Sequence, residues 1–130
     1  MTIAYRCDHL HLRSLDAAAA ASFYVEAMGA KETARMTVRD RLRVILDLGG
    51  LNLFIEDVPA DTARAPAAMP FVGIEHLGLT VDDLDAAMAA HRARGTRIIT
   101  EAQQVRPGVR MAFLEGPDGV VLELLERRAA

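Results

Sequence analysis

One short pattern occurs twice in this chain, and this internal repeat restricts the possible folds more than any other feature. Residues 8–12 read DHLHL, and residues 75–79, 67 positions later, read EHLGL. The acid, the first histidine and both leucines are common to the two copies. Further landmarks keep nearly the same spacing: Asp16 with Asp83, residues 19–20 with 86–87, Gly29 with Gly95, and Gly50 with Gly119. We therefore expect two halves built on one plan.

Each half reads as a strand, a helix and three more strands. In residues 6–13 the leucines alternate with polar side chains, which is typical of a half-buried strand. Asp16 is a suitable N-cap for a helix over residues 17–28, and Gly29 is a suitable stop. Turn-forming residues then separate strands at 31–38, 42–48 and 51–56. The second half repeats this order, with a strand at 73–81, a helix from Asp82 or Asp83 to residue 94, and strands at 96–101, 109–115 and 120–125.

The predicted fold class is α+β. Two βαβββ modules, at about residues 5–57 and 73–127, would be joined by an Ala- and Pro-rich linker at about 58–72, within one domain of residues 1–130. We expect the two sheets to form a curved, incomplete mixed β-barrel around a shared hollow, with the helices outside.

Composition and charge exclude several classes of protein. The formal net charge is -3, so there is no basic footprint for nucleic acid. No stretch approaches the roughly 20 apolar residues that a membrane helix needs. The single cysteine, Cys7, cannot form an internal disulfide, and we expect a buried, inert thiol. Residues 1–8 lack the pattern of a secretory leader, so we expect a cytoplasmic protein that binds a small molecule.

The repeat also indicates candidate metal ligands. His9 and His76 occupy equivalent positions in the first strand of each half, on the side opposite the leucines that should pack on the helices. In the last strand, the same alternation sends Glu123 to that open side, where an unpaired carboxylate among apolar neighbours would be costly. We predict that these three side chains bind one divalent metal, either Fe(II), Mn(II), Ni(II) or Zn(II). Two imidazoles and one carboxylate leave positions for substrate oxygens.

Other polar residues have competing interpretations. His11 shares the face of His9 and could orient substrate or act as an acid or base, although Gly78 stands in its place in the second half. Glu123 could instead pair with Arg110. His91 follows the apolar stripe of its helix and should lie at a core edge. Four arginines could form a solvated strand face or receive a carboxylate or phosphate: Arg35, Arg39, Arg41 and Arg43.

The opening and closing motifs resemble those of the vicinal oxygen chelate superfamily, which includes glyoxalase I, bleomycin-resistance proteins and extradiol dioxygenases. The opening residues are DHL, SLD, FY and MG within positions 8–29, and the closing residues are EGPDGVVLEL at 115–124. The resemblance implies a glyoxalase-like fold with metal ligands at His9, His76 and Glu123. Glyoxalase I-type members usually add a carboxylate from the first half. Phe54 stands at that position here, and Glu56 lies two residues further on the same face.

The resemblance implies a metal-dependent lyase or isomerase that stabilises an enediolate, with Glu123 or Glu56 as the base. Two alternatives stay open, namely an Fe(II) extradiol-type dioxygenase and a non-catalytic ligand-binding protein of the bleomycin-resistance kind. Members are mostly dimers, so we also expect a homodimer.

Overall fold

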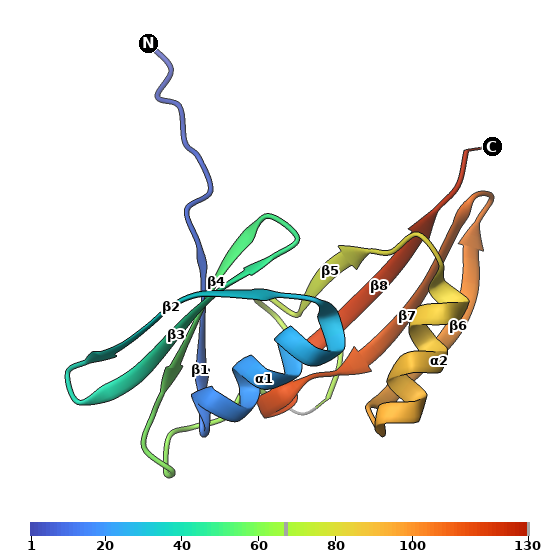
Figure 1. The fold of residues 1–130 in the computed structure, drawn as a ribbon. Helices are drawn as coiled ribbons and strands as arrows, with labels where there is room; N and C mark the ends of the chain where they lie inside the picture. Colours follow the sequence, from blue (N-terminus) through green and yellow to red (C-terminus); the bar gives the residue numbers. More distant parts are fainter. Residues whose placement is uncertain (67, 130) are drawn as a thin grey trace. The chain divides into compact units, whose positions relative to one another are not determined.

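The structure is a computed structural model that describes residues 1–66 and 68–129. The chain divides into two compact units, Met1–Thr62 and Ala63–Ala130. Each unit contains a strand, a helix and three further strands, in that order (Figure 1). The predicted α+β class with two βαβββ modules is therefore confirmed. The predicted linker at 58–72 includes Ala67, which lies outside the described residues.

The first unit is a four-stranded mixed sheet with one helix. Its elements are β1 (Leu10–Ser14), α1 (Ala17–Met28), β2 (Lys31–Val38), β3 (Arg41–Leu48) and β4 (Leu51–Asp57). The strand order is β1-β4-β3-β2. β1 runs parallel to β4, whereas β4, β3 and β2 form antiparallel neighbours.

The second unit repeats this topology. Its elements are β5 (His76–Thr80), α2 (Leu84–Arg94), β6 (Arg97–Arg106), β7 (Val109–Glu115), the short 3-10 turn η1 (Pro117–Gly119) and β8 (Val121–Arg127). The strand order is β5-β8-β7-β6, with β5 parallel to β8. The first strand of each half thus lies beside the last strand of the same half.

Local capping explains where the two helices begin and end. Asp16 and Asp83 each accept a hydrogen bond of 3.0 Å from the backbone amide three residues later. Gly29 and Gly95 follow the helices with φ of 72° and 81°, a left-handed conformation that glycine adopts without steric cost. The predicted caps are confirmed, with Asp83 rather than its neighbour as the second N-cap.

An acid at the end of the last strand ties each helix to its sheet. Asp57 Oδ1 accepts a hydrogen bond of 2.6 Å from the Ala17 amide. Glu126 Oε2 accepts one of 2.8 Å from the Leu84 amide. Both acceptors satisfy an amide of the first helical turn, which has no partner inside the helix. The repeat therefore extends to a side-chain contact that sequence spacing alone did not indicate.

Each helix covers one face of its sheet, and the apolar core lies between them (Figure 1). The buried side chains of the first core are Tyr24 together with small and branched residues, namely Ala17, Ala20, Ala21, Val44, Leu46, Leu53 and Ile55. The second core contains Leu84, Met88, Ala112, Leu114, Leu122 and Leu124. We call the opposite side of each sheet its open face. His91, 4% exposed, lies at the core edge as predicted.

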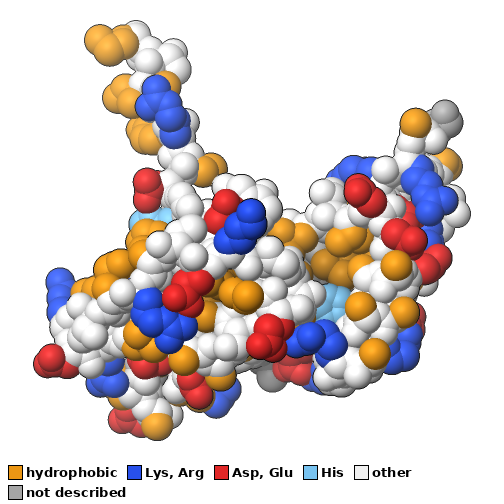
Figure 2. Space-filling view, viewed as in Figure 1, with side chains coloured by type: hydrophobic (Ala, Val, Ile, Leu, Met, Phe, Trp, Pro, Cys, Tyr) orange, Lys and Arg blue, Asp and Glu red, His pale blue; other side chains and the backbone are white. Residues whose placement is uncertain are grey.

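The first strand is shorter than predicted. β1 begins at Leu10, where pairing with Leu53 of β4 begins, and residues 1–9 precede it as an extended segment (Figure 1). Apolar side chains are exposed along this segment, with Tyr5 at 89% (Figure 2). Cys7 is exposed too. The prediction of a buried thiol was wrong because the sheet does not reach that residue.

The outer strands of the two sheets differ in regularity. β6 pairs with β7 through three register shifts, between Ile98 and Thr100, Thr100 and Gln103, and Gln104 and Arg106. β2 pairs with β3 through one shift. In the described part of the chain, no helix is long and apolar enough to cross a membrane.

Candidate metal centre

His76 and Glu123 lie close together on the open face of the second sheet. His76 Nε2 is 3.6 Å from Glu123 Oε1, and the two side chains are 32% and 19% exposed. Gly78 is the register partner of Glu123, and a Cβ at Gly78 would lie 3.4 Å from Glu123 Oε1. That separation is an ordinary van der Waals contact, so the carboxylate lies close over Gly78, beside the imidazole.

The other ring nitrogen of His76 contacts the preceding acid. Nδ1 lies 3.0 Å from Glu75 Oε1. A carboxylate at Nδ1 favours the tautomer with the proton there and leaves the Nε2 lone pair for a ligand. The ring also meets Phe113 edge-on, at 5.1 Å between centroids. The imidazole is thus held in place from two sides.

His9 has the same arrangement in the first unit. Its Nδ1 lies 2.6 Å from Asp8 Oδ2. Its ring stacks on Phe54 of β4, with centroids 4.0 Å apart and planes at 7°. Phe54 holds the place that Glu123 has in the second half, since their partners across the sheet are His11 and Gly78. The acid before each histidine is thus common to both halves, whereas the carboxylate on the last strand is not.

The donor set of the second half fits a divalent metal. Two ligand atoms about 2.0–2.2 Å from one ion are about 3.0–3.5 Å apart at octahedral or tetrahedral angles. The 3.6 Å between His76 Nε2 and Glu123 Oε1 is close to that separation. Within residues 1–66 and 68–129, no three His, Cys, Asp or Glu side chains form a group that could hold a metal. His9 belongs to the other unit, so a three-residue ligand set stays a prediction.

Glu56 lies among arginines on the open face of the first sheet. Arg43 donates to its Oε1 from Nε at 2.7 Å and forms an ion pair with it from Nη2 at 2.7 Å, and Arg13 donates to its Oε2. Burial raises the pKa of the Glu56 carboxyl, but the hydrogen bonds and charges of the two arginines lower it overall. The carboxylate is therefore ionised and already satisfied, which does not favour a fourth metal ligand. Its ligand role stays a prediction that the structure leaves untested.

His11 lies beside this ion-paired group. Its Nε2 is 4.0 Å from Glu56 Oε1, and it is buried with no hydrogen-bond partner among the described residues. Burial lowers the pKa of His11, and the positive charge of Arg13 lowers it further. The imidazole is neutral at pH 7, so it can accept a proton or a hydrogen bond there.

The proposed alternative partner of Glu123 is not found. Arg110 pairs with Asp85 at 2.8 Å and lies 3.8 Å from Glu126. Alternation places Arg110 on the helix side of β7, away from the open face. That interpretation was wrong. Arg35 of β2 pairs with Glu32 at 2.8 Å and does not join the cluster around Glu56.

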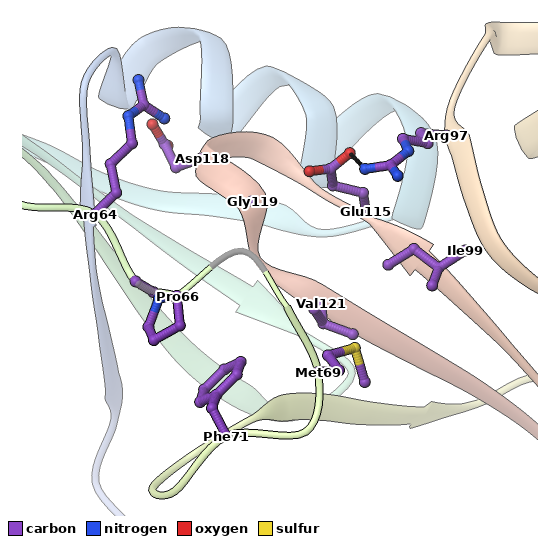
Figure 3. A pocket seen from close by; sticks show the side chains of 11 residues that line it. Arg64, Pro66, Met69, Phe71, Arg97, Ile99, Glu115, Asp118, Gly119 and Val121 are labelled. Atoms are coloured by element: carbon purple, nitrogen blue, oxygen red, sulfur yellow. Dashed lines mark hydrogen bonds and ion pairs between the residues drawn. The ribbon is translucent and has the colours of Figure 1, made fainter.

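A hollow of about 430 Å³ lies in the second unit (Figure 3). Val121 in its wall is the register partner of His76. Met69 and Phe71 come from the segment before β5, and Arg97 and Glu115 form an ion pair of 2.9 Å at one side. The remaining lining residues are Arg64, Ala65, Pro66, Ile99, Asp118 and Gly119. The hollow thus combines apolar walls with charges of both signs.

Residues 6–124 match the family described as the Glyoxalase/Bleomycin resistance protein/Dioxygenase superfamily, and the chain belongs to it. The protein YaeR of Escherichia coli (strain K12), itself described as uncharacterized, is 29% identical over 124 residues, covering 92% of this chain and 94% of YaeR. A probable chloroplastic lactoylglutathione lyase of Arabidopsis thaliana is 39% identical over 56 residues, covering 42% of this chain and 16% of the lyase. Similarity to that enzyme is therefore partial.

Solved structures share the fold. The glyoxalase family protein from Enterococcus faecalis has a TM-score of 0.76 and 24% identity, covering 91% of this chain and 94% of its own. The fosfomycin resistance protein FosX from Listeria monocytogenes, solved with Mn(II) and sulfate, has a TM-score of 0.73 and 14% identity, covering 97% and 95%. At least one relative with this fold thus holds a divalent metal, and members of the superfamily bind small molecules.

Three features of the site escaped the sequence analysis. The contacts of Asp8 and Glu75 had a visible signal, because an acid precedes the histidine in both copies of the repeat. The two arginine partners of Glu56 had no such signal in the sequence, since Arg13 lies 43 residues and Arg43 lies 13 residues away in the chain. The hollow depends on the course of the segment before β5, which has no periodic pattern.

Proposed function

We propose that this protein is a metal-dependent lyase or isomerase of the glyoxalase I-like type. One divalent metal would be bound by His9, His76 and Glu123. The observation that carries the proposal is the pairing of His76 Nε2 with Glu123 Oε1 at 3.6 Å, with Nδ1 of the same ring held by Glu75. The equivalent contact between His9 and Asp8 supports a matching ligand in the first half.

The chain's own residues account for the remaining parts of the reaction. When bound, the metal supplies Lewis-acid polarisation of substrate oxygens. Glu123 has a second carboxylate oxygen that can take a proton from the carbon beside a substrate carbonyl. His11, neutral and with an unsatisfied Nε2, is the second candidate for holding or returning that proton. Glu56 accepts hydrogen bonds from two arginines, so we assign it to holding their guanidinium groups in place rather than to proton transfer.

The hollow beside His76 supplies space for the organic part of the substrate. Its apolar wall includes Met69, Phe71 and Val121, which would exclude water from one side of a reacting carbon. Partial similarity to a probable lactoylglutathione lyase supports this class of reaction. A homodimer remains part of the proposal and is checked by light scattering at micromolar protein.

Metal analysis of the purified protein tests the proposal. We expect about one equivalent of metal after loading with Mn(II), Ni(II) or Zn(II), and loss of most of it in His9→Ala, His76→Ala and Glu123→Gln. Glu101→Gln is the matched control, because Glu101 is an exposed carboxylate of β6 paired with Arg92. Full metal content in all three ligand variants would refute the ligand set.

Activity assays then separate the reaction classes. Loss of the hemithioacetal of methylglyoxal and glutathione, or proton exchange beside a carbonyl in deuterated water, would support the lyase or isomerase. Oxygen uptake with catechol after anaerobic loading with Fe(II) would identify a dioxygenase instead. A protein that binds no metal and gains no thermal stability from any of these ions would be a ligand-binding protein.

A further inference from the structure

Residues 1–7 form an extended segment that has no strand partner in its own unit. They run on from β1 without belonging to a helix or strand (Figure 1). Among residues 1–66 and 68–129, no backbone hydrogen bond reaches this segment. All of its side chains are exposed. Backbone amides and carbonyls left in water can pair with a strand of another chain, so the segment is open to strand addition.

The side chains of this segment alternate as they do in a strand. Met1, Ile3 and Tyr5 are exposed apolar residues, at 118%, 67% and 89%. Cys7 continues the series, and the residues between them are polar or small. A period of two carries this series onto the side of His9, which is the open face of the first sheet. The segment therefore has one apolar side that its own unit does not cover.

The edge of the sheet beside this segment is also free. β1 stands at the end of the order β1-β4-β3-β2, so its outer edge has no strand neighbour in the part of the chain that the structure describes. The inner edge stays directed toward β4 as far as Asp8, whose backbone carbonyl accepts a hydrogen bond of 3.2 Å from Asn52. A strand added from outside would therefore extend the sheet and would not displace β4.

Charge favours a second copy of the same segment as that strand. Two identical strands pair antiparallel about a two-fold axis, and their apolar sides coincide only when the axis passes through a residue. With the axis at Cys7, Arg6 of each copy lies opposite Asp8 of the other, which gives two ion pairs. Both side chains are exposed, that of Asp8 at 88%. An axis at Ala4 would place Arg6 opposite Thr2 and lose both ion pairs.

The same arrangement covers the exposed apolar side chains. Tyr5 of one copy then faces His9 of the other, and Ile3 faces His11. The segment of each copy lies along the outer edge of the other copy's β1, so the backbone groups of both find partners. A tyrosine of the second copy would adjoin a proposed metal ligand of the first, and the candidate site would include a side chain from each copy.

We propose that two copies of this chain associate through residues 1–13, which pair antiparallel about a two-fold axis at Cys7. The first sheets of the two copies then form one continuous sheet. The inference rests on the homodimer of the proposed function and adds its contact surface, but it does not depend on the metal.

The single cysteine of the chain reports on this register. Facing Cα atoms of an antiparallel pair are about 4.5–5.5 Å apart, within the range of a disulfide. Diamide accepts the two protons and two electrons that two thiols release as the S–S bond forms. We expect brief treatment with equimolar diamide at micromolar protein to convert most of the wild type into a covalent dimer, measured by non-reducing electrophoresis.

The matched control is the double variant Ala4→Cys/Cys7→Ser. It carries one exposed thiol in the same segment, but the proposed register keeps the two thiols of a dimer roughly 20 Å apart. We expect it to remain mostly uncoupled under the same treatment. Equal coupling of the two proteins would show random collision or another register and would overturn the proposal.

Charge reversal tests the contact without oxidation. Arg6→Glu places like charges opposite each other and should raise the dissociation constant of the dimer at least about tenfold in analytical ultracentrifugation. Adding Asp8→Arg restores opposite charges and should bring the constant back to within about threefold of wild type. Arg106→Glu, which changes an exposed arginine of β6, is the control and should leave the constant unchanged.

The outcomes separate this surface from the proposed function. A wild type that is monomeric in light scattering would refute the homodimer and this surface together, while metal analysis still decides the ligand set. A dimer that Arg6→Glu leaves intact, or that Asp8→Arg does not restore, would keep the homodimer and overturn only this surface.

Discussion

Nδ1 of His76 lies 3.0 Å from Oε1 of Glu75, the residue before it in the chain. This contact holds the ring with Nε2 toward Glu123, so its removal should weaken metal binding without removing a ligand. We expect Glu75→Ala to weaken Mn(II) binding about 10- to 100-fold. The dissociation constant is measured by electron paramagnetic resonance of free Mn(II). Glu101→Gln serves as control, and equal affinities in all three proteins would show that the acid has no role at the metal.

Gly78 gives a prediction in which stability changes and metal binding does not. An added Cβ would lie 3.4 Å from Glu123 Oε1, an ordinary van der Waals contact that leaves the carboxylate in place. Alanine in a strand interior also loses less backbone entropy than glycine on folding. We expect Gly78→Ala to raise the unfolding free energy by up to about 1 kcal/mol and to leave Mn(II) affinity unchanged. Urea unfolding and metal titration test the two effects separately, and a loss of affinity would show that a side chain at this position disturbs Glu123.

The ion pair of the first sheet can be exchanged for the apolar pair of the second. Arg43→Met alone leaves the buried Glu56 with one arginine and should destabilise the fold by about 1–3 kcal/mol. Adding Glu56→Leu reproduces the Met111 and Leu125 pair, and we expect stability to return to within about 1 kcal/mol of wild type. Denaturant unfolding of the wild type, the two single variants and the double variant gives the interaction free energy between positions 43 and 56. Simple additivity would mean that the charges contribute independently.

His91 predicts a loss of stability in mild acid. Burial, with the charge of Arg94, lowers the pKa of His91 below its ordinary 6.5. As pH falls below about 6.5, the unfolded chain takes up a proton that the folded protein does not, so stability declines toward the folded pKa. His91 Nδ1 lies 3.2 Å from Thr96 Oγ1. The variant His91→Gln keeps polar side-chain atoms near that hydroxyl but cannot take up a proton in this pH range.

We therefore expect the melting temperature of the wild type to fall between pH 7.5 and 5.5, and that of His91→Gln to fall less. Scanning calorimetry across this range measures both slopes. His11, whose pKa is also lowered, supplies the slope that remains. Parallel curves for the two proteins would mean that His91 is protonated in the folded state.

Features set by local sequence were predictable here. The helix ends follow from Asp16, Gly29 and Gly95, each of which acts on atoms within a few residues of itself. The same holds for β2 and β7, whose bounds match the prediction. The repeat added long-range information, because equal spacing implied that both halves share one order of elements.

Features set by distant partners were not predictable. The start of β1 depends on where β4 offers a partner, and that partner is Leu53. Alternation correctly put Glu56 on the open face, but its protonation and contacts depend on Arg13 and Arg43 from two other strands. In physical terms, periodicity fixes the direction of a side chain, whereas the groups that neutralise it are set by register.

The three shifts along β6 have a consequence for how this protein behaves in concentrated solution. A free strand edge invites further chains to add when its amides and carbonyls project in an even row. Bulges break such a row and twist the outer strand away from flatness. The margin formed by β6 is therefore a poor template for β-aggregation, whereas β2, with one shift, relies on charged side chains such as Lys31 and Arg35 to discourage unwanted pairing.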